Sequence, residues 1–183
     1  EQHWTPCPAC VAEKRRDEEI KEHIKNNKLV KQNAMSVLFK QAAIPPKFEN
    51  CNFDNFNADT QEKSLVKNAL QEYSKNIKQN LTVPKNVILA GNPGTGKTHF
   101  SAAIAKRAIE KGYTALFTTC GEMIARVKGP WDKWPVIEKY AQPDLLILDD
   151  LFGELVTDEK RYLFDILNKR YECQKTTIIQ TNL

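Results

Sequence analysis

The stretch that decides the fold is Gly91-Asn92-Pro93-Gly94-Thr95-Gly96-Lys97-Thr98, which directly follows the apolar run Val87-Ile88-Leu89-Ala90. Its pattern is G-x-x-x-x-G-K-T. The glycines let the backbone turn its N–H groups inward, and a helix that begins near Lys97 adds the positive end of its dipole. The stretch therefore predicts a loop between a strand and a helix that binds the phosphates of a nucleotide.

Two side chains of this loop have a predicted chemical role. Lys97 supplies a mobile positive charge for the β- and γ-phosphates, and the Thr98 hydroxyl is placed to ligate Mg²⁺. We therefore expect ATP or ADP with Mg²⁺ as cofactors and Lys97 as a catalytic residue. The expected nucleotide-binding residues are Gly91, Asn92, Pro93, Gly94, Thr95, Gly96, Lys97, Thr98 and His99.

A second pattern is the apolar run 145–148, which ends in the paired carboxylates Asp149 and Asp150. A short, wholly apolar run is typical of a central parallel strand that is buried on both faces. Its carboxyl end would lie beside the phosphates, so we expect Asp149 to hold Mg²⁺ and Asp150 to polarise an attacking water as a catalytic residue. The alternative is that the two acids only terminate the strand.

The hydrophobic pattern after Pro84 alternates between strands and helices. Strands are predicted at 86–90, 113–118, 144–149 and 176–181, and helices at 97–111, within 121–141, and at 158–173. This order predicts an α/β fold with a parallel sheet, helices on both faces and the ligand at the carboxyl ends of the strands. At the last strand exit, Asn182 is expected to sense the γ-phosphate as a third catalytic residue, or to be a turn residue only.

Composition sets the broad class. A chain of 183 residues can bury one good core plus a small appendage, and its apolar content of 41% is ordinary for a globular protein. Neither a membrane-spanning run nor a secretory signal is visible, so we expect a cytoplasmic protein without membrane contact. The net charge of +4 permits nucleic-acid contact without arguing for it. The chain lacks an initial methionine and stops just after a strand, so we expect a fragment.

The first part of the chain differs from the rest. Residues 11–42 are rich in charge and predict a helix with a thin apolar stripe, either solvated or completed by a partner, which ends before Pro45-Pro46. A further helix is expected over residues 60–80. Cys7 and Cys10 form a C-x-x-C knuckle that predicts half of a zinc site on a tight turn, the alternative being two free surface cysteines.

Basic residues suggest two further surfaces. Arg126, Lys128 and Trp131 interleave cations with an aromatic ring around a Gly-Pro break, which predicts a groove for single-stranded DNA or, alternatively, a solvated loop. The charges of Arg161, Lys169 and Arg170 are expected to mark a solvent-exposed helix face, the alternative being contact with a neighbouring subunit or DNA.

Taken together, the motifs at 91–98, 144–150, 163–172 and 176–183 resemble those of AAA+ ATPases of the DnaC/DnaI helicase-loader group. The segment 44–56, with its prolines and phenylalanines, resembles the junction before the ATPase core in that group. The resemblance covers nearly the whole chain and leaves host or phage origin open.

This resemblance implies three parts: a helicase-binding region at residues 1–43, a linker at 44–59 and an ATPase core at 60–183. The implied function is an ATP-dependent loader that binds a replicative hexameric helicase, self-assembles through its ATPase domains and places the helicase on single-stranded DNA. An arginine finger and a helical lid are expected beyond residue 183. Asp150 stands where many AAA+ proteins have Glu, which implies slow hydrolysis. Phe53 or Phe56 is expected near the adenine or in the core.

Three other functions remain open at this point. A transposition helper ATPase of the IstB kind shares the core motifs, whereas the C-x-x-C pair and the proline-rich linker favour the loader. A small-molecule kinase would need an acceptor pocket that the sequence does not indicate. A nucleotide-gated adaptor with little hydrolysis would share every motif and differ only in turnover.

Overall fold

The computed structural model describes residues 7–129, 132–151 and 157–182. Its helices are α1 (Pro8–Gln41), a 3-10 turn η1 (Pro46–Phe48), α2 (Gln61–Lys75), α3 (Ile77–Thr82), α4 (Lys97–Glu110), α5 (Cys120–Lys128), α6 (Trp134–Ala141) and α7 (Thr157–Glu172). Its strands are β1 (Val87–Ala90), β2 (Ala115–Thr119), β3 (Leu145–Asp149) and β4 (Thr176–Thr181). The alternation predicted after Pro84 is confirmed.

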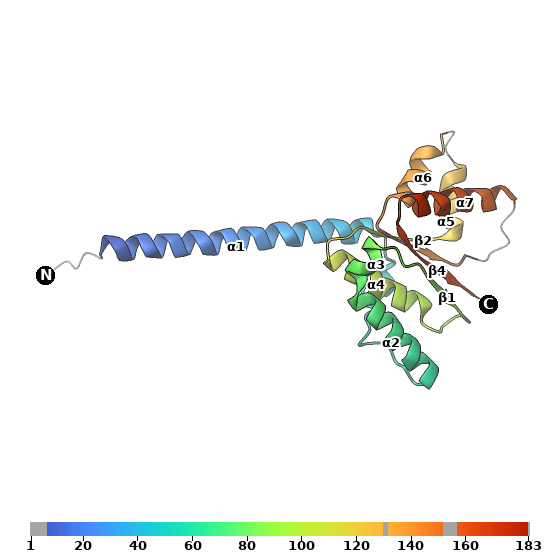
Figure 1. Ribbon diagram of the computed structural model, residues 1–183, viewed down its shortest axis with the longest axis horizontal. Coiled ribbons are helices and arrows are strands. Elements are labelled where there is room, and N and C mark those ends of the chain that lie inside the picture. The colour runs from blue at the N-terminus through green and yellow to red at the C-terminus, as the bar shows by residue number, and fades with distance from the viewer. Residues whose placement is uncertain (1–6, 130–131, 152–156, 183) are drawn as a thin grey trace. The chain divides into compact units, whose positions relative to one another are not determined.

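The four strands form one parallel sheet in the order β1-β4-β3-β2. Helices α2, α3 and α4 lie on one side of the sheet, and α5, α6 and α7 lie on the other (Figure 1). Strand β4 lies between β1 and β3, and a predicted site residue follows each of these three strands. The predicted α/β class with flanking helices is therefore confirmed, and the strand order brings the predicted site residues to one edge.

The helix predicted over residues 60–80 is two helices, because the chain turns at Asn76. The side chain of Asn76 donates to the backbone oxygen of Glu72 at 3.1 Å and to its carboxylate at 2.7 Å. This local bonding ends α2 by satisfying carbonyl groups that a longer helix would use. Helix α2 begins at a conventional cap, since the Thr60 hydroxyl accepts from the N–H of Lys63 at 3.2 Å.

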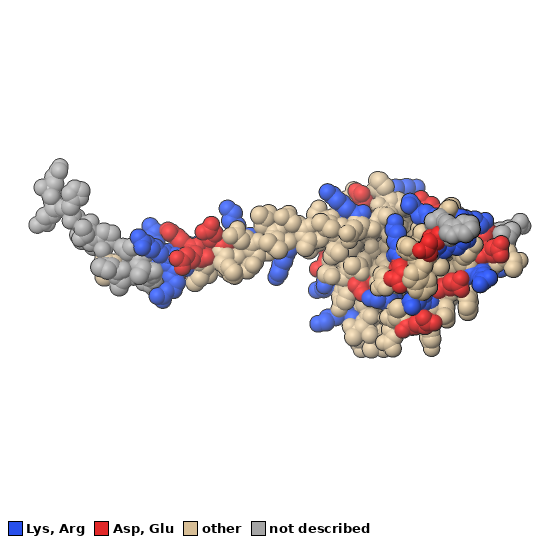
Figure 2. Space-filling model, turned by 90° about the horizontal axis from the view of Figure 1, so that it is seen from above, with Lys and Arg blue, Asp and Glu red and all other residues tan. Residues whose placement is uncertain are grey.

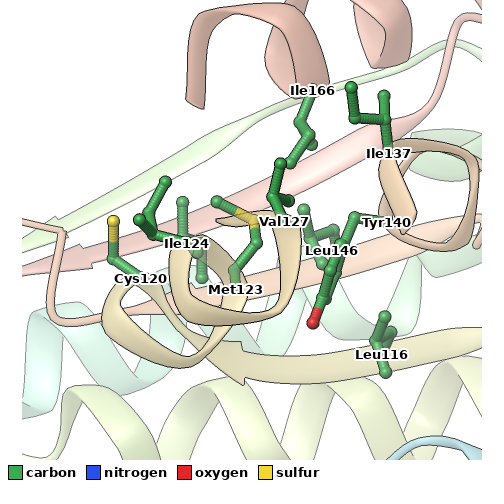
Figure 3. Close-up of a cluster of buried hydrophobic side chains, with 10 residues drawn as sticks. Leu116, Cys120, Met123, Ile124, Val127, Ile137, Tyr140, Leu146 and Ile166 are labelled. Carbon is green, nitrogen blue, oxygen red and sulfur yellow. The ribbon is translucent and has the colours of Figure 1, made fainter. Parts of the chain in front are cut away.

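A buried cluster joins helices α5, α6 and α7 to the sheet (Figure 3). Its members are apolar or aromatic and at most 8% exposed: Leu116, Cys120, Met123, Ile124, Val127, Ile137, Tyr140, Leu146, Leu148 and Ile166. Leu146 and Leu148 reach the cluster from β3, so the alternate residues of that strand face the α4 side. This alternation decides which side chains of β3 can meet the nucleotide loop.

The solvent-face interpretation of Arg170 is wrong. Its side chain is 1% exposed, although Arg161 on the same helix is exposed as expected. The Arg170 guanidinium donates to the backbone oxygens of Tyr140 and Ala141, both at 3.0 Å, and to the Thr177 hydroxyl at 2.9 Å. It also donates to Pro143 and Thr176 oxygens. Burial lowers the pKa of Arg170, but its bonds to carbonyl dipoles at the end of α6 stabilise the charge.

The described chain divides into two compact units, residues 1–37 and 38–183. In the first unit, charged side chains are dense near the start of α1 and sparser farther along it (Figure 2). Apolar side chains of α1 are 52–65% exposed at Ile20, Ile24, Leu29, Val30 and Val37. Within its own unit, α1 therefore carries exposed apolar side chains along its length.

No helix within the described residues is long and apolar enough to span a membrane. The predicted boundaries at residues 43 and 59 stay a prediction.

Candidate nucleotide-binding site

The loop 91–96 turns sharply between β1 and α4. Gly94 and Gly96 have φ angles of +82° and +95°, in the left-handed region where a side chain is strained. The N–H of Gly91 donates to the Thr181 oxygen at 3.3 Å, which ties the loop to the end of β4. Because α4 starts at Lys97, its free N–H groups lie at the loop, as a phosphate cradle requires.

The Lys97 ammonium lies inside this loop. It donates to the backbone oxygen of Gly91 at 2.6 Å and to that of Asn92 at 2.9 Å. Because the lysine side chain is flexible, its ammonium can leave these two carbonyl oxygens and bind phosphate oxygens without a change in the backbone.

Oxygen ligands gather beside the start of α4. The Thr98 hydroxyl donates to Asp149 Oδ2 at 3.2 Å, although 51 residues separate the two in sequence. The other oxygen, Oδ1, accepts from the N–H of Asp150 at 2.9 Å. A hydroxyl and a carboxylate are hard oxygen donors of the type that Mg²⁺ prefers, so the residues present fit this ion.

Asp150 and Asn182 complete the site. The backbone of Asp150 is left-handed, with φ +55°, an uncommon conformation for a non-glycine residue and one that is frequent at active sites. The Asn182 amide donates to Asp150 Oδ1 at 3.4 Å, and both side chains are exposed. The structure thus brings Lys97, Thr98, Asp149, Asp150 and Asn182 to the carboxyl ends of three adjacent strands.

An apolar cavity of 330 Å³ lies next to the loop. Its lining combines apolar side chains with residues of the loop: Glu62, Lys63, Val66, Leu70, Ile88, Leu89, Ala90, Gly91, Thr95, Lys97 and Phe100. The sequence interpretation missed the contributions of α2 and β1 to this cavity. Ile88 is 70% exposed, although its neighbours on the strand are also apolar. The hydrophobic pattern of the sequence does not reveal this exposure, because it depends on how the helices cover the sheet.

The two phenylalanines expected near the adenine or in the core do not line this cavity. Phe53 and Phe56 pack instead on Phe100, with ring centroids 5.8 and 4.2 Å apart. This arrangement favours the core-packing alternative over contact with an adenine. Phe56 also lies against the ring of His99, at 5.3 Å.

The linker is fastened along α4. His99 Nε2 is 2.7 Å from the Asn52 backbone oxygen, so this predicted nucleotide-binding side chain faces the linker. Lys106, two turns farther along α4, donates to the backbone oxygens of Glu49 at 2.6 Å and Cys51 at 3.1 Å. Residues 49–52 therefore pack along α4, the helix that follows the glycine-rich loop.

Gly96 has a second reason to be glycine. A Cβ at this position would lie 2.9 Å from Phe56 Cζ and closer still to Cε2.

We expect Gly96→Ala to lower the free energy of unfolding by about 2–3 kcal/mol, from backbone strain and from displacement of the ring. Gly112→Ala is the matched control, since φ is +85° but the space is open, and about 1 kcal/mol is expected. Equilibrium denaturation measures both; equal losses would contradict the role of Phe56.

The predicted DNA groove is described only in part. Arg126 and Lys128 are exposed in the last turn of α5, and Lys128 pairs with Glu159 at 2.6 Å, whereas Trp131 lies outside the described residues. On the face of the second unit that Figure 2 displays, basic and acidic side chains are interspersed. DNA contact by these residues stays a prediction.

The zinc prediction is not supported. Helix α1 begins at Pro8, directly after the exposed Cys7, so the backbone between the two cysteines is helical where the C-x-x-C pattern predicts a tight turn. The Cys10 side chain lies outside the described part of the structure. Within that part, no group of three or more His, Cys, Asp or Glu side chains could hold a metal ion.

Comparison with known proteins places this geometry in a family. The sequence model described as "IstB-like ATP binding protein" matches residues 16–183. The chain belongs to this IstB-like family. Among curated relatives, the replicative helicase loader DnaC of Buchnera aphidicola subsp. Acyrthosiphon pisum is 25% identical over 167 residues, which are 87% of this chain and 65% of that protein. This member of the IstB-like family thus spans less than two thirds of that relative's length.

Solved structures support the same assignment. The crystal structure of the DnaC helicase loader has a TM-score of 0.65 and 28% identity, and covers 75% of this chain and 80% of its own. AMPPCP-bound DnaA from Aquifex aeolicus shares the fold, with a TM-score of 0.61, 24% identity and coverage of 77% and 44%. The IstB-like chain therefore has an AAA+ P-loop fold, and the predicted resemblance to the DnaC group is confirmed.

Proposed function

We propose that this protein is an ATP-switched loader of a replicative hexameric helicase. Nucleotide binding is supported by five side chains that lie together at the carboxyl ends of the strands: Lys97, Thr98, Asp149, Asp150 and Asn182. The similarity to DnaC loaders supports the helicase part.

Each side chain then has one task. Lys97 leaves its carbonyl partners to bind the β- and γ-phosphates, while Thr98 and Asp149 hold Mg²⁺. Bound Mg²⁺ supplies charge neutralisation at the phosphates. Asp150 accepts a hydrogen bond from the attacking water and orients it, and its short side chain makes hydrolysis slow. Asn182, bonded to Asp150, changes partner when the γ-phosphate is present.

The apolar cavity beside the loop takes the nucleobase. Its volume of 330 Å³ suits a purine ring, and Val66, Leu70 and Ile88 supply apolar contact area. The Lys97 side chain lines the same cavity, so base and phosphates are bound by one continuous surface.

The exposed apolar side chains of α1 serve as the helicase contact. Ile20 and Ile24 are 52% and 62% exposed and lie one turn apart, so they form one contact surface on the helix. The exposed apolar side chains of such a helix can pack into a hydrophobic groove on a partner protein. Self-assembly of the ATPase domains supplies an arginine from a neighbouring copy, and the loader engages single-stranded DNA.

A transposition helper is the second candidate, because the matching family is described as IstB-like. The two functions share the nucleotide site and differ in partner. A loader binds a hexameric helicase and single-stranded DNA, whereas a transposition helper binds a transposase and duplex DNA.

Co-elution of the full chain with its cognate replicative helicase tests the proposal. With ATP and single-stranded DNA, we expect a stable complex that Ile24→Glu weakens at least tenfold, because a charge replaces an apolar anchor. Lys25→Glu, at the adjacent position, which is also exposed, is the control and should retain the complex. Absence of a complex with any nucleotide would refute the loader and favour the transposition helper.

A further inference from the structure

Two buried polar side chains have no visible partner. Among the described residues, the buried side-chain nitrogen and oxygen atoms without a hydrogen bond are Ser101 Oγ and both amide atoms of Gln180. Each side chain is 0% exposed. Buried polar groups in folded proteins are nearly always bonded, so a fully buried amide with both ends free indicates a missing partner.

The side of the sheet that Gln180 faces follows from its neighbours on β4. The Thr177 hydroxyl accepts from Arg170 of α7, so Thr177 faces α7, whereas the Thr176 hydroxyl donates to the Asn80 oxygen of α3. Because side chains alternate along a strand, Gln180 lies on the same side as Thr176 and Ile178. Gln180 therefore faces the side that α4 covers.

Asp149 occupies the neighbouring position on β3. Ile147 and Ile178 are paired in register across the two parallel strands. Two residues farther along both strands stand Asp149 and Gln180, which therefore share a face on strands about 4.8 Å apart. The bond from Thr98 to Asp149 shows that this face meets the start of α4.

Ser101 approaches the same region from the helix. It follows Thr98 by three residues, so both hydroxyls lie on one side of α4. Thr98 contacts Asp149, and Ser101 is buried one turn deeper. The two unpartnered residues thus lie between α4 and the sheet, Gln180 beside Asp149 and Ser101 one turn of α4 beyond Thr98.

We propose that Gln180 is a positioning residue for Asp149, with Ser101 as its support; the inference rests on the proposed nucleotide and Mg²⁺ site. When metal and nucleotide bind, Gln180 Nε2 donates to the Asp149 carboxylate, directly or through one buried water, and Oε1 accepts from the Ser101 hydroxyl. These bonds orient the carboxylate that Thr98 and the metal share. Residues that hydrogen-bond to a metal ligand commonly fix the orientation of that ligand and raise the affinity for the metal.

The test is Mg²⁺-dependent binding of a fluorescent ADP analogue to the full chain. For Gln180→Met, which keeps the side-chain shape without the amide, we expect the Mg²⁺ concentration for half-maximal binding to rise about tenfold. Binding in EDTA should stay within about twofold of wild type, because the phosphate loop is unchanged. Ser101→Ala should shift the Mg²⁺ requirement in the same direction by a smaller factor.

Ile178→Val is the matched control, since it alters the same face of the same strand without a polar group and should leave the Mg²⁺ requirement unchanged. An unchanged Mg²⁺ requirement in folded Gln180→Met would overturn the inference, as would equal losses with and without Mg²⁺. If Gln180→Met does not fold, Gln180→Leu provides the same readout. Wild-type protein that binds no ADP analogue, with or without Mg²⁺, would instead refute the proposed nucleotide site itself.

Discussion

Replacing Arg170 by methionine is expected to lower the free energy of unfolding by about 3–5 kcal/mol. The guanidinium donates to four backbone oxygens and one hydroxyl, and three of those oxygens belong to Tyr140, Ala141 and Pro143 at the end of α6. Methionine fills much of the volume but donates nothing, so buried acceptors lose their partners. Equilibrium denaturation followed by circular dichroism measures the loss.

Arg161→Met is the control for this change. It is the same substitution on the same helix, but Arg161 is exposed, so we expect a change within about 0.5 kcal/mol. A loss below about 1 kcal/mol in Arg170→Met would mean that the buried carbonyls find other partners. The expected effect is on stability and not on nucleotide affinity, because Arg170 bonds to residues at the amino ends of β3 and β4.

Lys97→Ala is expected to weaken ATP binding by about 100-fold or more. The Lys97 ammonium lies in the loop within hydrogen-bond distance of Gly91 and Asn92 oxygens, where the phosphates would bind. Loss of one partner from a desolvated charge pair costs about 2–5 kcal/mol, and 1.4 kcal/mol corresponds to a factor of ten. Titration with a fluorescent ATP analogue measures the change.

Two comparisons make the Lys97 result specific. Lys111→Ala removes an exposed lysine just after α4 and should leave ATP affinity within about twofold. Adenosine, which has no phosphates, should lose far less affinity than ATP on Lys97→Ala, because the phosphate contacts of Lys97 are absent from its complex with wild type. Equal ATP affinity of wild type and Lys97→Ala would refute the phosphate-binding role of the loop.

The nucleotide loop and the paired aspartates could be predicted because their signals are local. Gly94 and Gly96 require backbone conformations that few residues adopt, and Lys97 and Thr98 stand at a helix start. Asp149 ends an apolar strand, so parallel-sheet topology alone predicts that it comes close to the loop. Every predicted strand overlaps an observed one, because short apolar runs bounded by Pro, Gly and Asp leave few alternatives.

Arg170 could have been recognised in part from the sequence. It follows the buried Ile166 by four residues, so both occupy the same side of α7. An arginine is usually exposed to solvent. Here the backbone carbonyl groups at the end of α6 lack helical hydrogen-bond partners, and they accept hydrogen bonds from the buried guanidinium. No sequence pattern places those carbonyls beside α7.

The sequence by itself determined the order of strands and helices and the residue types at the phosphate loop, since these depend on backbone preferences and on burial within short segments. Only the tertiary structure decided that Phe56 packs against Gly96 and that an apolar cavity opens beside the loop. It also decided that Gln180 is buried beside Asp149 on the neighbouring strand. The physical reason is that these features are contacts between different helices and strands, and their packing and hydrogen-bond partners depend on how the helices are placed on the sheet.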